Sequence, residues 1–358
     1  MTLFSLSDRR IRDSELREYG DYCSRIEIVY LPRNRSYLQC LAGLAGRRPL
    51  QVYYYHTKEM ERLISKEINS FDLVFVHLIR MAEYVKDYLD ISKVIDFTDA
   101  ISLNYQRSIR YQKGFRYLIS LIEQKRVLRY EIDIISSFDK NLFVSEVDKT
   151  YIEQYTDAGN IDVIPAGVDT DYFSYCDSDY EANEIVFVGN MRTYPNSDAA
   201  YYFAKKIFPM ILQKVPDARF TISGAYPTRS IRSLNGKGNI FVTGRVEDVR
   251  PYLKKAAVSV CPMRAGAGVQ NKVIESMASG TPVVTSLIGS EGIGAVSGRD
   301  ILIAENEQDF AEKVTTLMND KELREKISRS GRKFIEEKFA DTIAADKFQC
   351  MIAGFQNK

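Results

Sequence analysis

Short runs of β-branched and aromatic residues alternate with longer stretches of helical periodicity along almost the whole chain. Apolar runs of this kind, without polar residues at every second position, are typical of strands that are buried on both faces of a parallel sheet. The helix-length segments between them supply the crossover connections that parallel strands require. The pattern therefore predicts a doubly wound α/β protein.

The predicted elements fall into two blocks. In the first block we expect strands at residues 2–6, 25–31, 50–55, 72–77, 93–97, 141–145 and 161–166, and helices near 13–22, 56–69, 78–90, 113–134 and 146–157. In the second block we expect strands at 184–189, 218–224, 239–244, 257–262, 282–286 and 300–304, and helices at 197–214, 247–255, 269–279 and 306–319. Two such blocks predict two Rossmann-like domains that face one another across a cleft.

The join between the domains is expected in IPAGVDTDYF (164–173), where Pro165 and Gly167 interrupt the pattern. From Lys321 onward the chain is helical and charged, with Gly331 as the expected break. Two successive helices after the final strand cannot both be crossovers, so one of them must pack elsewhere. We therefore expect a first domain of residues 1–165 completed by a C-terminal helix of about 340–358, and a second domain of residues 166–339.

Composition excludes several classes of protein. The 358 residues suffice for two domains with their own cores. A net charge of +1 argues against disorder and against a dedicated nucleic-acid binder. No run approaches 18 apolar residues, and the start MTLFSLSDRR becomes polar too early for a signal peptide. We expect a soluble, cytoplasmic protein.

Charge is distributed slightly unevenly between the two halves. Residues 1–150 hold 24 Lys and Arg against 21 Asp and Glu, whereas the remainder has a small acidic excess. A basic excess of this kind favours a peripheral contact between the first domain and an anionic lipid surface, such as the inner face of the membrane.

Metal and disulfide chemistry are not expected. Only two histidines occur, His56 and His77, which leaves little scope for a multi-histidine zinc site or a histidine-driven triad. The strings at 169–171 and 177–179 have the form Asp-x-Asp, and we interpret both as solvated turns. Five scattered cysteines without a Cys-x-x-Cys pair predict incidental thiols: Cys23, Cys40, Cys176, Cys261 and Cys350.

The strongest candidate site is VSVCPMRAGAGVQNKVIESMASGTPVV (258–284). A strand ends near Pro262, a loop of small residues follows, and a helix begins near Val269. Ligands of open α/β sheets bind outside the carboxyl ends of strands, where helix N-termini present free amides. We expect the unpaired amides of Gly268, Val269 and Gln270 to point at an incoming anion.

Charged side chains flank this loop. Arg264 and Lys272 suit a pyrophosphate, and Glu275 lies one helical turn after Lys272, where its carboxylate could accept hydrogen bonds from a ribose diol. The alternative is that Gly266 and Gly268 only shape a turn, with Lys272 and Glu275 forming a surface ion pair.

The segment resembles the donor-site signature of the group-1 glycosyltransferases, family 4 of the GT-B fold. The stretches at 184–209, 222–227 and 242–263 agree with that signature in order and spacing, as does the join at 164–173. The strings DFTDA (96–100) and LFVSEVD (142–148) are similar to ones found in sugar transferases of bacterial exopolysaccharide systems.

The resemblance implies a metal-independent, retaining transfer of a sugar from a nucleotide diphosphate to a glycan or lipid-linked acceptor hydroxyl, in surface polysaccharide biosynthesis. It implies no resident cofactor. It places Arg264, Lys272 and Glu275 in the catalytic site, and Gly189, Gly268, Val269 and Gln270 at the donor diphosphate.

Further positions follow from the same resemblance. Arg245 and Val246 are expected at the nucleobase, through backbone contacts that leave uracil, guanine and adenine equally open; Arg245 could equally be a surface residue. His77 and Asp99 are the acceptor-side candidates. The alternative for His77 is a satisfied core histidine, and Asp96 is interpreted as a helix cap or turn residue. We interpret QVYYYH (51–56) as a buried strand rather than an aromatic acceptor wall.

Three departures from the family pattern bear on catalysis. Ala267 stands where the family usually has the first of two glutamates, although the resembled subgroup often lacks that carboxylate and has a lysine like Lys272. Asn190 and Asn196 stand where an Arg and a Lys usually contact the diphosphate. We therefore hypothesise that Arg264 and Lys272 neutralise it instead.

The third departure is at the front of the chain, because TLFSLSD resembles the second strand of the family. An opening strand–loop–helix unit, whose strand normally lies mid-sheet, is expected to be missing. A shifted start, a rearranged sheet and completion by a partner chain are the three explanations.

Two other functions remain open: a nucleotide-binding subunit without catalysis, favoured by Ala267, and a sugar-nucleotide epimerase, disfavoured by the scarcity of acid–base groups.

Overall fold

The computed structural model describes residues 1–175 and 180–356, and its strands form parallel sheets. The chain folds into two compact units. The first unit comprises residues 1–105, 113–143 and 149–162, and the second comprises 106–112, 144–148 and the chain from 163 onward. The domain assignment made from the sequence, including the place of the C-terminal helix in the first domain, stays a prediction.

The elements of the first part of the chain confirm most of the predicted order. They are β1 (Thr2–Ser7), α1 (Asp13–Gly20), β2 (Arg25–Tyr30), α2 (Arg33–Gly43), α3 (Leu50–Tyr55), α4 (Lys58–Glu67), β3 (Leu73–His77), α5 (Ile79–Ala82), β4 (Ser92–Thr98), α6 (Ile101–Ser108), α7 (Phe115–Ser137), β5 (Lys140–Phe143), α8 (Glu146–Glu153) and β6 (Ile161–Val163). The strands form two separate sheets, β1-β2 and β3-β4-β5-β6.

The predicted strand at 50–55 is wrong, because this segment is helix α3. Pro49 precedes it with φ −57°, a value suited to helix entry. The buried carboxylate of Glu123 accepts the Leu50 N–H at 2.7 Å. A Cβ at Gly43 would lie 2.5 Å from the Tyr53 ring, so the ring packs directly on that glycine. Tertiary contacts have overridden the strand preference of tyrosine and valine.

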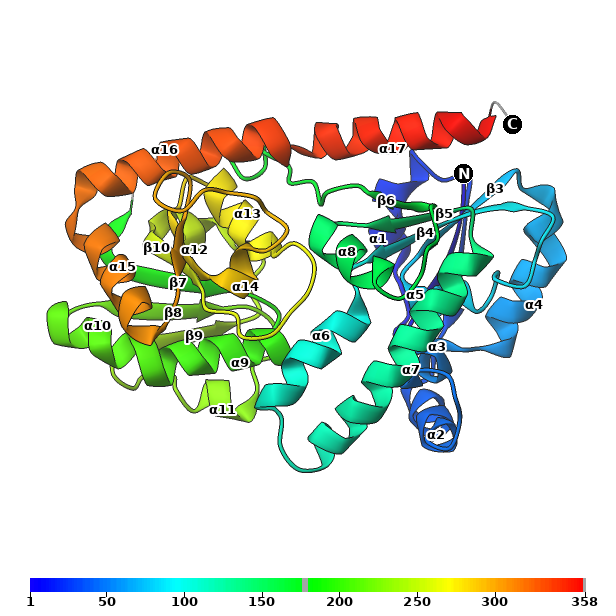
Figure 1. Ribbon diagram of the computed structural model, residues 1–358, viewed down its shortest axis with the longest axis horizontal. Helices are drawn as coiled ribbons and strands as arrows, with labels where there is room; N and C mark the ends of the chain where they lie inside the picture. Colours follow the sequence, from blue (N-terminus) through cyan, green and yellow to red (C-terminus); the bar gives the residue numbers. More distant parts are fainter. Residues whose placement is uncertain (176–179, 357–358) are drawn as a thin grey trace. The chain divides into compact units, whose positions relative to one another are not determined.

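The second part of the chain follows the predicted alternation closely. Its elements are β7 (Glu181–Val188), α9 (Tyr194–Tyr202), a π-helical turn (Phe203–Ile207), α10 (Phe208–Lys214), β8 (Arg219–Ser223), α11 (Arg229–Arg232), β9 (Ile240–Gly244), α12 (Arg250–Lys255), β10 (Ala256–Cys261), α13 (Asn271–Ala278), β11 (Val283–Ser286), α14 (Leu287–Ser290), β12 (Leu302–Ala304), α15 (Glu307–Asn319), α16 (Lys321–Lys338) and α17 (Asp341–Gln356). Figure 1 labels most of these elements.

Alternate residues of β7 point into two different apolar clusters. Ile185 and Phe187 join the main core, whereas Val186 packs with Leu253 of α12 on the other face. The main core includes an aromatic cluster, in which the ring of Phe203 lies 4.6 Å from that of Phe220. Both faces of the sheet are therefore covered, which explains why its strands are apolar without alternation.

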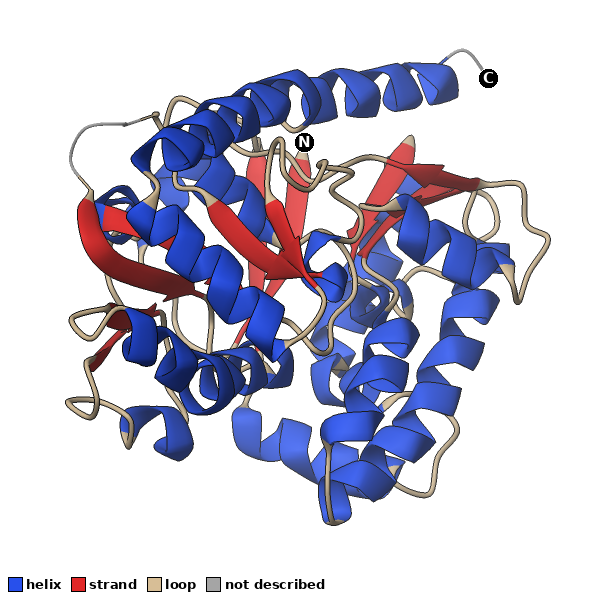
Figure 2. Ribbon diagram, turned by 60° about the vertical axis from the view of Figure 1, so that its left-hand side comes forward, coloured by secondary structure: helices blue, strands red, loops and turns tan. Residues whose placement is uncertain are grey.

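The predicted helix break at Gly331 is wrong, because α16 runs unbroken through it. A Cβ at Gly331 would lie 2.8 Å from the backbone oxygen of Asp300, so the glycine allows the helix to approach that loop closely. The break falls after Lys338 instead. Figures 1 and 2 show α16 and α17 following one another toward the C-terminus.

The predicted join segment is held at this break. Val168 donates its N–H to the Phe339 oxygen at 2.8 Å and accepts the Asp341 N–H at 3.1 Å. A Cβ at Gly167 would lie 2.8 Å from the Asp341 Cα, so only glycine fits there. The glycine that interrupts the sequence pattern therefore permits a backbone pairing with the α16–α17 connection.

Candidate functional site

The sheet of the second unit has the strand order β12-β11-β10-β7-β8-β9, with all pairs parallel. From β7 the chain winds outward through β8 and β9, and then returns to β10 on the other side of β7. This is the Rossmann order, and the topological switch point lies between β7 and β10. The sheet therefore brings the loop after Val188 next to the loop after Cys261, where ligands of such sheets bind.

The loop after β10 leads into α13 through two glycines with left-handed or strained backbone. Gly266 has φ 144° and Gly268 has φ 67°, values that a side chain would make costly. Helix α13 follows from Asn271, and the N–H groups of Val269 and Gln270 have no acceptor among the described residues. Two free amides at a helix N-terminus form an anion site.

The Gly268 N–H is not free, contrary to expectation. It donates to the carboxylate of Asp148, with nitrogen–oxygen distances of 3.0 and 3.3 Å. Asp148 is fully buried and also accepts a hydrogen bond from the Ser145 hydroxyl. Since residues 144–148 belong to the second unit, the string LFVSEVD supplies this unit with an internal anion.

Arg264 also has a carboxylate partner. Its Nη2 lies 2.7 Å from Oδ1 of Asp198 and its Nε lies 3.0 Å from Oδ2, which is a bidentate pair. The guanidinium carbon lies 4.5 Å from the ring centroid of Tyr111 and 4.3 Å from that of Tyr202. Sequence reasoning missed Asp198, and the predicted role of Arg264 toward the diphosphate stays a prediction.

Lys272 is aimed back toward the start of its own helix. Its Nζ donates to the side-chain oxygen of Gln270 at 2.8 Å and lies 6.0 Å from the ring centroid of Phe187 on β7. The buried Gln270 donates in turn to the Ala267 oxygen at 3.1 Å. The cation therefore lies beside the free amides of the loop, at the switch point.

Glu275 lies on the next turn of α13. Burial raises its pKa above the ordinary value of a glutamate, and the nearby charge of Lys272 partly opposes that shift. Among the described residues, Lys272 and Glu275 form no ion pair within 4.0 Å, so the alternative of a surface ion pair is wrong. Its predicted hydrogen bonds to a ribose stay a prediction.

The loop after β7 packs closely on the loop after β8. Gly189 donates to the Ser223 oxygen at 3.0 Å, and a Cβ at Gly224 would meet the Gly189 oxygen. Asn196 donates its amide to the Asn190 oxygen at 3.1 Å, so these two asparagines shape the loop.

The same loop carries a cation that sequence reasoning missed. Arg192 is exposed, and its guanidinium carbon lies 4.0 Å from the ring centroid of Tyr226 in the loop after β8. Its position three residues beyond Gly189 in a strand-end loop is the signal that could have found it.

The predicted nucleobase positions follow β9. Gly244 has φ 72° and its oxygen accepts the Gly224 N–H at 3.1 Å, which ties this turn to the loop after β8. Arg245 is exposed and Val246 is half-buried. The contact with a base stays a prediction for both.

In the first unit, His77 and Asp96 lie at the carboxyl ends of the adjacent strands β3 and β4. His77 Nδ1 lies 2.9 Å from Asp96 Oδ2, and the histidine side chain is 62% exposed, so His77 is not a core residue. Asp96 also accepts the Thr98 N–H at 2.7 Å, which is the turn role that we expected for it. Asp99 is half-buried just beyond, and its acceptor role stays a prediction.

Backbone strain marks the same strand ends. Leu78 has φ 72° and Thr98 has φ 66°, although neither is a glycine. Left-handed conformations of such residues cost about 1–3 kcal/mol and cluster at functional sites. The strain therefore supports the choice of this edge for the acceptor-side candidates.

We also examined the Asp-x-Asp strings, possible clusters of metal ligands and possible membrane-spanning helices among the described residues. Asp169 accepts the N–H groups of Asp171 and Tyr172, as a turn residue does; the second string, 177–179, and Cys176 lie outside the described residues. Within the described chain no group of three metal-ligating side chains is found, and no helix is long and apolar enough to cross a membrane.

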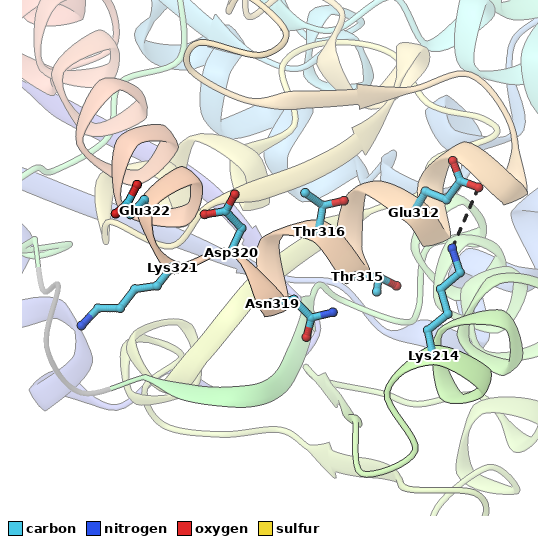
Figure 3. A pocket seen from close by; sticks show the side chains of 8 residues that line it. All are labelled: Lys214, Glu312, Thr315, Thr316, Asn319, Asp320, Lys321 and Glu322. Carbon is cyan, nitrogen blue, oxygen red and sulfur yellow. Dashed lines mark ion pairs between the residues drawn. The ribbon is translucent and has the colours of Figure 1, made fainter.

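Figure 3 shows a hollow lined by α10, α15 and the start of α16, with Lys214 and Glu312 3.9 Å apart. Helix α10 leads into the beginning of β8, so this hollow lies at the amino edge of the sheet. Ligands of open α/β sheets bind at the opposite edge, and we therefore assign it no ligand.

Comparison with known proteins points to the same segment of the chain as the geometry of the switch point. Residues 182–320, which contain the switch-point loops, match the family model of the group 1 glycosyl transferases. The expected resemblance to the group 1 glycosyltransferases is thus confirmed for that segment.

Two curated relatives match parts of this chain. An uncharacterised 44.6 kDa protein of the cps region of Klebsiella pneumoniae is 28% identical over 218 residues, covering 58% of this chain and 54% of that protein. The capsular polysaccharide biosynthesis glycosyltransferase CapM of Staphylococcus aureus is 30% identical over 158 residues, 41% of each chain. The chain thus matches about half or less of the length of these relatives.

Solved structures show the same fold. Sucrose-phosphate synthase from Thermosynechococcus elongatus is similar with a TM-score of 0.70 at 14% identity over 100% of both chains. HepE of Anabaena, in complex with UDP and glucose, has a TM-score of 0.69 at 12% identity, covering 99% of this chain and 100% of that one. The expected α/β GT-B fold class is confirmed.

Proposed function

We propose that the chain is a glycosyltransferase, which transfers a sugar from a nucleoside diphosphate donor to a hydroxyl of a glycan or lipid-linked acceptor. The observation that carries the proposal is the convergence of the free amides of Val269 and Gln270 with Lys272 at the switch point of a Rossmann-ordered sheet. It lies within the segment that matches the group 1 glycosyl transferases. HepE, one of the similar structures, binds UDP-glucose.

The chemistry of such a transfer suits these groups. The bond between the anomeric carbon and the β-phosphate oxygen breaks, and negative charge develops on the leaving diphosphate. Fixed amides and an ammonium group that point at this charge stabilise it more in the transition state than in the ground state. We propose that they do this without a metal ion.

The acceptor hydroxyl then forms the new bond to the anomeric carbon, and its proton passes to the leaving phosphate oxygen. Attack from the side of the leaving group keeps the anomeric configuration, so the proposed transfer is retaining. His77, held by Asp96, is the proposed contact for the acceptor in the first unit. The similarity to CapM, a capsular polysaccharide biosynthesis glycosyltransferase, and to a protein of the cps region supports surface polysaccharide biosynthesis as the process.

The alternative is a subunit that binds the nucleotide without catalysis. Ala267 favours it, because no carboxylate stands at this point of the donor loop. A panel of UDP-, GDP- and ADP-sugars, examined first by calorimetry and then by mass spectrometry of products, separates the two functions. Binding followed by hydrolysis or transfer supports the enzyme, binding without turnover supports the subunit, and absence of binding contradicts both.

A further inference from the structure

Helix α2 presents apolar side chains to solvent. Tyr37, Leu38, Leu41 and Leu44 are all exposed, and their spacing places them on one side of the helix and its C-cap. Ser36 and Gly43 are buried on the opposite side. The helix therefore has one side that packs on the first unit and a second, solvent-exposed apolar side, where the ring of Tyr37 contacts that of Tyr54 on α3 but stays 61% exposed.

The N-terminal half of α7 has the same character. Phe115, Leu118, Leu121 and Ile122 are exposed at intervals of three, four and seven residues, which is one helical stripe. Leu118 is 55% exposed. The buried residues of this helix follow a different stripe that begins at Ser120.

The two helices meet within the first unit. Arg126 of α7 donates to the Leu44 oxygen at 2.6 Å and to the Gly43 oxygen at 3.4 Å, at the C-terminal end of α2. Figure 1 shows α2 beside α7. We call the eight exposed residues of the two stripes the α2–α7 apolar face.

The charged residues of these two segments are almost all positive. Residues 33–48 contain four arginines and no Asp or Glu, and residues 113–129 contain five Lys and Arg with Glu123 as the single acid. Glu123 is 2% exposed. The exposed charges of both segments are therefore cations, among them Arg35, Arg47, Arg116 and Lys125, although the net charge of the whole chain is only +1.

We infer that the α2–α7 apolar face binds the surface of an anionic lipid membrane. Helices that combine a leucine-rich stripe with flanking Lys and Arg bury the stripe at the headgroup boundary and attract acidic lipids. A second copy of the chain fits less well, because a two-fold interface would bring the same cationic rim against itself. This inference goes beyond the proposed function, since it needs neither a donor nor turnover.

Vesicle flotation of the full chain tests it, with vesicles of phosphatidylcholine alone and of phosphatidylcholine mixed with phosphatidylglycerol. We expect binding to the mixed vesicles that falls at high salt. The double variant Leu118→Ser, Leu121→Ser should lower the partition coefficient at least tenfold, as should Arg116→Glu, Lys125→Glu. All four side chains are exposed, so both variants should fold.

Matched controls lie on the same unit. Leu89 is 87% exposed and outside both stripes, so Leu89→Ser should leave flotation unchanged, as should Arg62→Glu on α4. Equal binding to both kinds of vesicle, no binding to either, or equal losses in the controls would overturn the inference. Concentration-dependent dimers abolished by the leucine substitutions would assign the face to a second copy. UDP calorimetry of the same variants reports separately on the donor site.

Discussion

The backbone N–H of Gly268 donates to the buried carboxylate of Asp148 at 3.0 Å. The first amide of the expected phosphate loop is thus paired with an internal anion, while the next two amides stay free among the described residues. A phosphate bound at Val269 and Gln270 would lie close to this carboxylate. Asp148 therefore holds the loop in shape and would also oppose the charge of a donor phosphate bound there.

Replacing Asp148 with Asn separates these two effects. Asn keeps an oxygen that accepts the Gly268 N–H but removes the negative charge. We expect Asp148→Asn to bind UDP about fivefold more tightly, because two unit charges ~4 Å apart repel by about 1 kcal/mol even in water. Isothermal titration calorimetry measures the change. Weaker binding by a variant of unchanged stability would show that the charge does not oppose the donor.

Asp198 should contribute to the stability of the second unit through Arg264. Asp198→Ala leaves a partly buried guanidinium without its bidentate acceptor, which should cost about 1–3 kcal/mol in free energy of unfolding. Urea denaturation followed by far-UV circular dichroism gives the value. Glu337→Ala removes an exposed pair with Lys333 and should cost less than about 0.5 kcal/mol. Equal costs for the two variants would refute the assignment.

Glu131 should make the stability of the first unit depend on pH. Burial raises the pKa of this fully buried carboxyl to about 8, although the Ser102 hydroxyl and N–H oppose the shift. Because the folded state holds the proton more tightly, stability should fall as the pH rises from about 4.5 to about 8, by up to ~1.4 kcal/mol per unit. Glu131→Gln should flatten that decline in urea titrations across this range. A decline that persists unchanged would assign it to other groups.

Two helical glycines should respond oppositely to alanine. At Gly331 the new Cβ would lie 2.8 Å from a backbone oxygen, so Gly331→Ala should lower stability by about 1–3 kcal/mol. At Gly354 nothing lies within 4 Å, and the same change should raise it by up to about 1 kcal/mol. Thermal denaturation of both variants is the test, and a stabilising Gly331→Ala would contradict the packing described.

Most of the fold could be predicted from the sequence because the strands are buried on both faces and the helices between them are long. The errors fall where tertiary contacts decide. Residues 50–55 have strand-forming side chains, but Pro49 and the carboxylate of Glu123 fix a helix there. Gly331 looks like a helix break in the sequence, but it is a point of close packing.

The candidate site was predictable where it depends on one local segment. The loop from Arg264 to Glu275 could be read directly, because strand, glycines and helix follow in order. Partners from distant segments could not be predicted: Asp148 and Asp198 come from elements 120 and 66 residues away in the chain. The sequence does not show which distant residues these two aspartates contact. Their carboxylates therefore look the same in the sequence as those of exposed surface residues.

The central claim is that the amides at the start of α13 act with Lys272 to bind the diphosphate of a nucleotide donor. Titration of UDP into the chain and into Lys272→Ala tests it most directly, with Lys333→Ala on the exposed face of α16 as control. We predict that Lys272→Ala raises the dissociation constant for UDP about tenfold, because the substitution removes one charge-assisted contact to a phosphate. The control should bind as the parent does. An unchanged affinity of Lys272→Ala for UDP would contradict the account.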